Sequence, residues 1–327
     1  MSGRRETVIL PDGRRAPVWW YEHPAEPGNP HRSGRRDPSR TVLLVHGFRG
    51  DHHGLAGIAA ALAEASPGLR IVVPDLPGFG AADALAGRHD VASYARFVRL
   101  VAEAVGDGQA PALVGHSFGS IVAAHAVAAG PDAFSTLTLI NPIAAPALEG
   151  PQALMSRLAQ LYYAAGARLP EPVGQALLRN RIIVRVMSEV MATTKDPALR
   201  RFIHDQHRRY FSAFADRRVV QEAFTASVTG TVTEVADRLR LPVQLIAGDA
   251  DDIAPLDTQH RLHALLPGSE LSVIAGVGHL THYETPELVA GLIADFLDRH
   301  PAADAPPRPG GSAEAGTSSG RTTGAAS

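Results

Sequence analysis

From residue 41 onward, short apolar runs alternate with longer segments in which apolar residues recur at helical spacing. An apolar run of about five residues between polar or glycine positions is typical of a strand that is buried on both faces. The predicted strands lie at 41–45, 70–73, 111–114, 135–140, 242–247 and 270–274. The predicted helices between and after them lie at 55–65, 91–105, 117–129 and 256–266. This alternation predicts an α/β fold with a mainly parallel sheet and helices on both of its faces.

The rhythm changes between 143 and 238, where the sequence contains no clear strand. Helical stretches are predicted there at 152–165, 173–191, 197–214 and 219–226. In the first of them, one helix face carries leucines at i, i+4 and i+7, namely Leu154, Leu158 and Leu161. We therefore expect a helical domain at 143–238 that interrupts a core formed by 41–142 and 239–300.

The two ends of the chain differ from this core. Alternating stretches at 7–11 and 17–21, separated by Asp12-Gly13, predict a β-hairpin. The residues that follow, 26–40, are rich in Pro, Gly and Arg. We expect residues 1–40 to form this hairpin and an exposed, solvated loop. The alternative is that the arginines of this loop form an anionic docking patch. Residues 301–327 lack the apolar surface that would offset the entropy of ordering, so we expect a disordered tail.

Composition narrows the class of protein. The chain has 327 residues, is 45% hydrophobic and carries a net charge of −2, which suits one sizeable α/β domain and gives no general argument for nucleic-acid binding. Cysteine is absent, which excludes a thiolate nucleophile and a thiolate metal site. No signal-like apolar run follows the N-terminus, and no window reaches the roughly 18 apolar residues of a spanning helix. We expect no membrane span and a cytoplasmic location.

Histidine clusters raise the question of a metal site. His204 and His207 lie three apart on a predicted helix, and His52-His53 adjoin Asp51. Neither group has a third ligand at a convincing spacing, so we expect no metal.

The stretch Gly115-His116-Ser117-Phe118-Gly119 lies between a predicted strand and a predicted helix. Glycines two residues either side of a serine allow a sharp turn that leaves the hydroxyl facing a cleft. The helix that starts at the serine directs its free N–H groups and positive end toward the place where an oxyanion would form. Such a pentapeptide can arise by chance in a chain with 31 glycines, but the strand–turn–helix context favours a nucleophile.

A serine hydroxyl is a poor nucleophile until a base takes its proton, and a third group must orient that base. Asp251 follows the predicted strand at 242–247, and His279 follows the predicted strand at 270–274. Because the carboxyl ends of parallel strands meet at one edge of a sheet, we expect both side chains to lie near Ser117.

Five blocks in this order resemble the α/β-hydrolase superfamily, in its serine-nucleophile, esterase- or lipase-like branch. The resemblance spans residues 41–299 and is weakest in the middle. The blocks are HGFRG at 46–50, PDLPGFG at 74–80, the serine turn at 115–119, G-x-x-D-x-x-x-P at 248–255, and Gly278-His279. The resemblance implies the α/β-hydrolase fold, with a mainly parallel twisted sheet and with 143–238 as a helical cap over the active site.

The resemblance also implies roles for single residues. Ser117 would be the nucleophile, Asp251 the orienting acid, and His279 the general base and then the general acid. Two backbone N–H groups, those of Phe48 and Phe118, would form the oxyanion hole.

The acid and the base each have rivals. Asp249 and Asp252 flank Asp251, and the family's G-x-x-D spacing favours Asp251. Asn141 occupies the family's other acid position, after the sixth strand, and cannot carry the charge. His282 is a second imidazole in the same loop as the predicted base, and we expect it to be a loop residue or a pocket wall.

If 143–238 is a cap, its apolar residues line a substrate pocket together with the loops at the sheet edge. The candidates for the pocket wall are His46, His116, Leu158, Tyr162, Met187 and Phe211. The alternative is that the cap residues only hold helices together, and that His46 holds its loop. The pairs Arg208-Arg209 and Arg217-Arg218 could meet a substrate carboxylate, although a solvated helix face is the simpler interpretation.

We therefore predict a cofactor-independent serine hydrolase that cleaves a carboxylic ester through an acyl-enzyme at Ser117. The expected partner is a small molecule with an apolar acyl or ester group, and the oligomeric state stays open. Carbon–carbon bond hydrolases, thioesterases, lactonases and perhydrolases use the same triad and are the nearest alternatives. An enzyme for carrier-bound acyl chains is another, and a non-catalytic ligand-binding protein with this fold is an alternative of a different class.

Overall fold

The computed structural model describes residues 3–22, 40–146 and 153–301, except for the side chains of 153–156. Of the predicted loop at 26–40 only residue 40 is described, and of the predicted tail at 301–327 only residue 301 is described.

An eight-stranded sheet runs through the centre of the molecule, in the order β1-β2-β4-β3-β5-β6-β7-β8. Its strands are β1 (Arg4–Ile9), β2 (Arg15–Tyr21), β3 (Thr41–Val45), β4 (Arg70–Pro74), β5 (Ala112–His116), β6 (Leu137–Ile140), β7 (Val243–Gly248) and β8 (Glu270–Ile274). The first two strands form the antiparallel hairpin, which joins the sheet along β4, and all neighbours from β4 to β8 are parallel. The α/β prediction with a mainly parallel sheet is confirmed.

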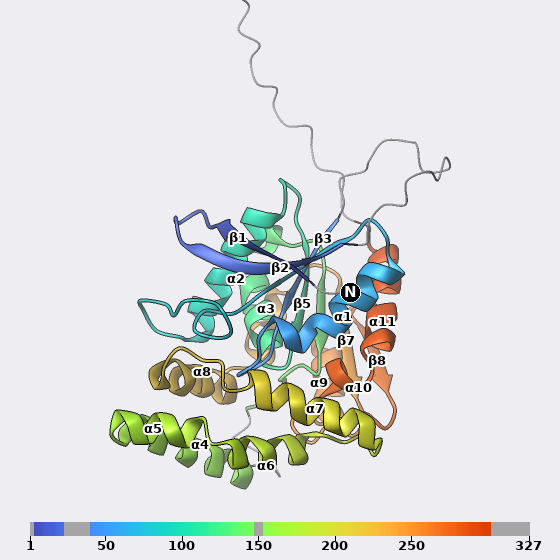
Figure 1. Cartoon of the computed structure of the whole chain (residues 1–327). Coiled ribbons are helices and arrows are strands. Elements are labelled where there is room, and N and C mark those ends of the chain that lie inside the picture. Colours follow the sequence, from blue (N-terminus) through green and yellow to red (C-terminus); the bar gives the residue numbers. More distant parts are fainter. Residues whose placement is uncertain (1–2, 23–39, 147–152, 302–327) are drawn as a thin grey trace, which may run out of the picture.

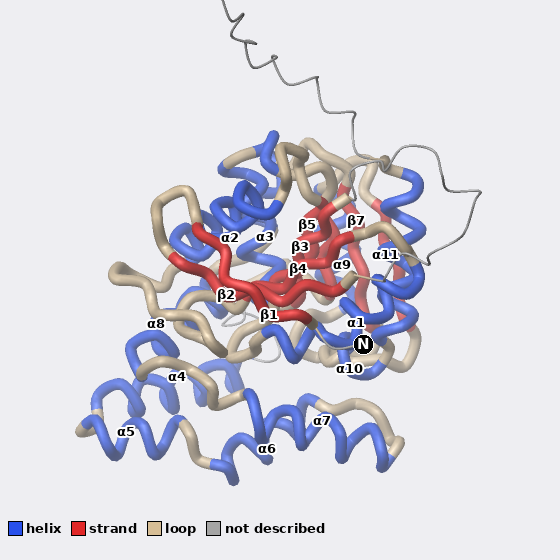
Figure 2. Tube along the Cα trace, turned by 45° about the horizontal axis from the view of Figure 1, so that its top comes forward, coloured by secondary structure: helices blue, strands red, loops and turns tan. Residues whose placement is uncertain are grey.

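Helices cover both faces of this sheet (Figure 2). Helices α1 (His52–Ala65) and α11 (Pro286–Arg299) pack together on one face, and α2 (Val91–Val105) and α3 (Phe118–Ala129) pack together on the other. Each face has its own apolar core, because alternate strand residues such as Leu43 and Leu44 point to opposite sides. Every residue of β3, β5 and β7 is buried, as expected for strands covered on both faces.

Within the described residues, five α-helices between β6 and β7 gather at one end of the molecule, beyond the carboxyl ends of the parallel strands (Figure 1). They are α4 (Ala153–Arg168), α5 (Glu171–Leu178), α6 (Arg181–Met191), α7 (Pro197–Tyr210) and α8 (Arg217–Thr229), and we call them the helical insertion. The prediction of one helix at 173–191 is wrong. The chain breaks at Arg179 and Asn180, where the Asn180 side chain accepts from the amides of Ile182 and Ile183 and starts a new helix.

The remaining regular helices are α9 (Leu256–Leu265), which follows β7, and the short α10 (Thr281–Glu284), which precedes α11. Within the described parts of the chain, none of the helices has the length and apolar character needed to cross a bilayer.

Candidate active site

Ser117 sits between the end of β5 and the first residue of α3, in a strained backbone conformation with φ 55° and ψ −120°. A side chain rarely adopts this region, and such strain concentrates at functional sites. The two glycines of the motif make the turn possible. A Cβ on Gly119 would lie 2.2 Å from the carbonyl oxygen of Val45, and one on Gly115 would lie 2.4 Å from the carbonyl oxygen of Gly119.

The hydroxyl of Ser117 contacts the predicted base directly. Its Oγ lies 2.7 Å from Nε2 of His279, and Nδ1 of the same ring lies 2.7 Å from Oδ2 of Asp251. An ionised carboxylate only accepts, so Nδ1 carries the proton and Nε2 is free to accept from the serine hydroxyl. The structure thus brings the three predicted residues into one hydrogen-bonded line, although they are up to 162 positions apart in sequence.

The carboxylate of Asp251 is held on both oxygens. Its Oδ1 accepts from the amides of Ile253 and Ala254 at 2.8 and 2.9 Å, while its Oδ2 accepts from Nδ2 of Asn141 at 2.7 Å. Burial alone would raise the pKa of Asp251, but the imidazole and these amides hold it below its ordinary value. The group is therefore a buried, ionised partner for His279.

Asn141 has a structural role that the sequence did not reveal. Its Nδ2 also donates to the carbonyl of Gly278 at 3.0 Å, and its Oδ1 accepts from the hydroxyl of Thr281 at 2.9 Å. Since Gly278 precedes His279, Asn141 ties the acid to the loop that carries the base. The signal in the sequence was its place at the end of a strand next to β7, where we considered only its missing charge.

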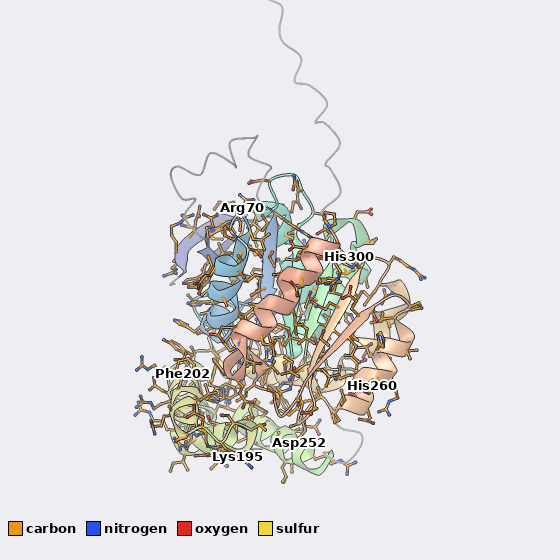
Figure 3. All side chains as sticks on the ribbon, turned by 90° about the vertical axis from the view of Figure 1, so that its right-hand side faces the viewer. Arg70, Lys195, Phe202, Asp252, His260 and His300 are labelled. Atoms are coloured by element: carbon orange, nitrogen blue, oxygen red, sulfur yellow. The ribbon has the colours of Figure 1, made fainter. Side chains whose placement is uncertain are left out.

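The rival residues lie elsewhere. Asp249 accepts from the amide of Gly276 at 2.6 Å, and Asp252 is exposed on the surface near the helical insertion (Figure 3). His282 is buried behind the base, with its ring centroid 4.1 Å from that of His116, and its Nδ1 has no hydrogen-bond partner among the described residues. Burial, and then the neighbouring imidazoles, lower the pKa of His282 well below its usual range.

Two backbone amides beside the serine are available as donors. Phe118 is the first residue of α3, and Phe48 lies in the turn after β3. This turn lies close to the serine, since a Cβ added to Gly47 would lie 3.3 Å from Cβ of Ser117. Neither amide donates to an acceptor among the described residues. An oxyanion hole requires two such donors beside the nucleophile, and this role of the two amides stays a prediction.

His46 and His116 are both buried beneath this site. Nε2 of His46 accepts from the amide of Leu76 at 2.9 Å, so its Nδ1 carries the proton and donates to the carbonyl of Gly47. His116 contacts the carbonyl of His279 through Nε2 at 3.2 Å. Burial, and then His279, lower the pKa of His116 to about 3, so it is neutral at neutral pH. In this structure both rings hold loops of the site in place.

The predicted pocket residues of the helical insertion have different surroundings. Leu158 is 51% exposed, and the hydroxyl of Tyr162 donates to the carbonyl of Leu177 at 3.1 Å. Met187 is half-buried on α6, and Phe211 is half-buried at the end of α7. Among the described residues, no hydrogen bond or ring contact links any of these four to Ser117. Their place in a substrate pocket therefore stays a prediction.

Asp51, His52 and His53 come together at the start of α1, where three potential ligand atoms lie within 4.8 Å of one another. Hydrogen bonds account for this grouping. Nδ1 of His52 lies 2.9 Å from Asp75, Nδ1 of His53 lies 3.1 Å from Asp51, and the side chain of Asp51 also caps the helix. The second histidine pair lies on α7, where His204 and His207 each direct Nδ1 to the hydroxyl of Ser188.

Two further residues near the site make side-chain contacts that the sequence did not indicate. Ser120 is fully buried and donates its hydroxyl to the carbonyl of Ser117 at 2.5 Å. Arg49, next to Phe48, is 1% exposed. A charged residue in a turn predicts exposure, so no local signal in the sequence indicates its burial.

Comparison with known proteins agrees with this architecture. Residues 40–286 match the model of the alpha/beta hydrolase fold family. The chain is 27% identical over 265 residues to an uncharacterized protein of Mycobacterium tuberculosis, covering 79% of this chain and 75% of that protein. It is 24% identical over 270 residues to a pimeloyl-(acyl-carrier protein) methyl ester esterase of Neisseria meningitidis, covering 82% of this chain and 96% of that protein. A thermophilic esterase from Thermogutta terrifontis has a similar structure, with a TM-score of 0.67, 22% identity, and coverage of 91% of this chain and 99% of that chain. The family match spans most of the sequence, and this chain belongs to the alpha/beta hydrolase fold family.

Proposed function

We propose that this chain is a serine hydrolase that cleaves carboxylic esters through an acyl-enzyme at Ser117. The observation that carries the proposal is the line of two 2.7 Å hydrogen bonds from Ser117 through His279 to Asp251. Membership of the family supports a hydrolase in general, and the esterases among the similar proteins support an ester as the substrate.

In the first half of the reaction, Oγ of Ser117 attacks the acyl carbon while its proton moves to Nε2 of His279. The carbonyl oxygen becomes an oxyanion, to which the amides of Phe48 and Phe118 would donate. Asp251 stabilises the imidazolium that forms. The intermediate collapses, the ester C–O bond breaks, and His279 returns the proton to the leaving alcohol.

In the second half, a water molecule attacks the acyl-enzyme and gives one proton to His279. The second tetrahedral intermediate releases the carboxylic acid, and His279 returns the proton to Oγ of Ser117. Both half-reactions use the same three residues, and the chemistry needs no cofactor or metal ion.

We also propose that the helical insertion acts as a cap that shapes the acyl pocket. Its position beyond the carboxyl ends of the strands supports this role, because ligands of open α/β sheets bind at that edge (Figure 1). The six predicted pocket residues remain the candidates for contact with an apolar acyl group.

The test is hydrolysis of a p-nitrophenyl ester series, from acetate to palmitate, by wild type, Ser117→Ala and Ser93→Ala. Ser93 lies in the first turn of α2, has no hydrogen bond to Ser117, His279 or Asp251, and is the matched control. We expect Ser117→Ala to lose about 10⁴-fold or more in turnover and Ser93→Ala to match wild type. Full activity of Ser117→Ala would contradict the mechanism. Failure of a fluorophosphonate probe to label wild type would favour a non-catalytic, ligand-binding protein.

A second candidate function is hydrolysis of an ester whose acyl group is attached to an acidic carrier protein. One specific observation favours it, a cavity of about 580 Å³ between α6 and α7. It is lined by Arg181, Val184, Arg185, Arg201, His204, Asp205, Arg208 and Ser212. Four arginines against one aspartate suit an anionic partner, and the Neisseria relative is named for a substrate on an acyl-carrier protein.

Paired assays separate the two candidates. The same acyl methyl ester would be offered free and attached to an acyl-carrier protein, to wild type and to Arg181→Ala/Arg201→Ala. A carrier-specific enzyme hydrolyses the attached ester faster than the free ester. In the double variant the two rates should be equal, at high and at low salt. Equal rates on both forms would leave the simple esterase as the function.

A further inference from the structure

Arg49 is a charged side chain in the interior, directly after the residue whose amide we assign to the oxyanion hole. It is 1% exposed. Its three nitrogens each donate to a different part of the helical insertion. Nε donates to the carbonyl of Phe211 at 2.9 Å, Nη1 to the hydroxyl of Tyr163 at 3.2 Å, and Nη2 to the carbonyl of Leu178 at 2.9 Å. These acceptors come from the end of α7, from α4 and from the end of α5.

All three acceptors are neutral, and no carboxylate of the described residues pairs with Arg49. The guanidinium instead lies against aromatic rings, 4.4 Å from the centroid of Phe211 and 5.3 Å from that of Phe214. A buried charge is tolerated only where hydrogen bonds and polarisable neighbours replace water. The helical insertion provides that environment, so Arg49 stays buried only while these helices are seated on it.

The backbone at Arg49 is unfavourable for a side chain. The amide of Gly50 donates to the carbonyl of Gly47 at 3.1 Å, which closes a tight turn at 47–50. Arg49 occupies the third position of this turn with φ 58°, a conformation that favours glycine. An arginine is therefore present despite a backbone cost, which its contacts offset.

Phe48 reinforces the same attachment from the neighbouring position. Its ring lies 5.5 Å from the ring of Tyr163 and 5.8 Å from that of Phe224, so it packs against α4 and α8. Tyr163 is thus contacted by both Phe48 and Arg49. The Gly47–Phe48 peptide, which carries the Phe48 amide, lies in a turn whose next two side chains both attach to the helical insertion.

We infer that Arg49 is a positioning residue that couples the helical insertion to the oxyanion hole. Seating α4, α5 and the end of α7 on the guanidinium sets the turn, and the turn aims the Phe48 amide at the substrate oxygen. When these helices move away, the amide loses its fixed direction. The inference rests on the proposed function for its catalytic consequence, and on the contacts of Arg49 for its structural part.

Two variants separate position from charge. Arg49→Gly suits the left-handed backbone and keeps the turn accessible, but removes all three contacts. Arg49→Lys keeps the positive charge, but one ammonium group cannot reach three acceptors in different directions. The matched control is Arg179→Ala. Arg179 is exposed, donates to the carbonyl of Phe214 at 2.9 Å and lies 4.8 Å from its ring, but does not contact the turn.

We expect Arg49→Gly and Arg49→Lys to lower kcat for p-nitrophenyl esters about 10²-fold, as for loss of one oxyanion donor, with little change in KM. Affinity for a trifluoromethyl ketone, whose adduct carries the oxyanion, should fall in parallel. Arg179→Ala should keep the wild-type kcat. Wild-type kcat in Arg49→Lys, or equal losses in Arg49→Gly and Arg179→Ala, would overturn the inference.

Amide hydrogen exchange gives a readout that needs no substrate. A peptide covering residues 46–51 should exchange faster in Arg49→Gly than in wild type or Arg179→Ala, because the turn has lost its attachment. Unchanged exchange in Arg49→Gly would overturn the inference. If wild type hydrolyses no ester, the proposed function fails, and the exchange experiment still decides whether Arg49 holds the turn.

Discussion

The proposed role of Asp251 can be tested by moving the carboxylate from the loop after β7 to the residue after the neighbouring strand β6. Asp251→Asn replaces the carboxylate by an amide that can turn its NH2 group toward Nδ1 of His279. The imidazole then has to present an unprotonated Nδ1, so its proton moves to Nε2 and the ring can no longer accept from Ser117. We expect turnover to fall about 10⁴-fold, or about 5 kcal/mol of transition-state stabilisation.

The double variant Asp251→Asn/Asn141→Asp should recover part of this loss. Nδ2 of Asn141 lies 2.7 Å from the same carboxylate oxygen that contacts His279, so a carboxylate at position 141 starts at most two hydrogen-bond lengths from Nδ1. Moving that carboxylate by up to one hydrogen-bond length, toward the place of the Asp251 oxygen, brings it into contact, and we expect recovery of at least about tenfold in kcat/KM.

The assay is kcat and KM on the preferred p-nitrophenyl ester, with thermal unfolding to establish that each variant folds. Asp252→Asn is the control, because this exposed neighbour of the acid should be dispensable. The reasoning is refuted if Asp251→Asn keeps more than about a tenth of wild-type turnover, where about 10⁴-fold is expected. It is refuted for Asn141 if the double variant is no faster than Asp251→Asn.

Two further predictions concern stability, both measured by urea unfolding. Gly119→Ala should destabilise the fold by about 3 kcal/mol, because its Cβ would lie 2.2 Å from the backbone oxygen of Val45. Gly291→Ala, in α11 with nothing within 4 Å of its Cβ, should stabilise it by about 0.5–1 kcal/mol, and similar effects of the two would contradict the packing argument. Burial, and then His204, lower the pKa of His207 from 6.5 to about 4, so the unfolded chain takes up the proton first as the pH falls. The free energy of unfolding should therefore decrease between pH 6.5 and 4, by about 3 kcal/mol from this residue, and the decrease should be smaller in His207→Gln.

The sheet and the order of the site residues could be predicted because they follow from local patterns. A buried parallel strand is a short apolar run, and Ser117, Asp251 and His279 each lie within five residues of the end of such a run. The predicted strand at 270–274 has the same bounds as β8, and Ser117 precedes α3 as expected. Only the family spacing favoured Asp251 over Asp249 and Asp252, because periodicity does not decide which of three neighbouring acids faces inward.

The contacts of the helical insertion could not be predicted for a physical reason. Its helices are short and amphipathic, and their packing depends on partners that are distant in sequence. The break at Asn180 illustrates this, because the apolar pattern continues through it while the side chain caps a new helix. Arg49 is the extreme case. Its three acceptors lie 114 to 162 residues away, and nothing within the turn distinguishes it from a solvated arginine.

In the proposed mechanism His279 becomes charged in the protein interior, and the protonation of the buried imidazoles beside it bears on that step. The ring of His116 lies 5.5 Å from that of His279, and the ring of His282 lies 4.1 Å from that of His116. A second positive charge at that distance would oppose the imidazolium by about 3 kcal/mol at an effective dielectric constant of about 20. Because burial and the neighbouring rings lower the pKa of both His116 and His282, this opposition is absent at neutral pH. The two imidazoles near His279 are therefore uncharged, and the carboxylate of Asp251, in direct contact with the ring, would favour the proposed proton transfer from Ser117.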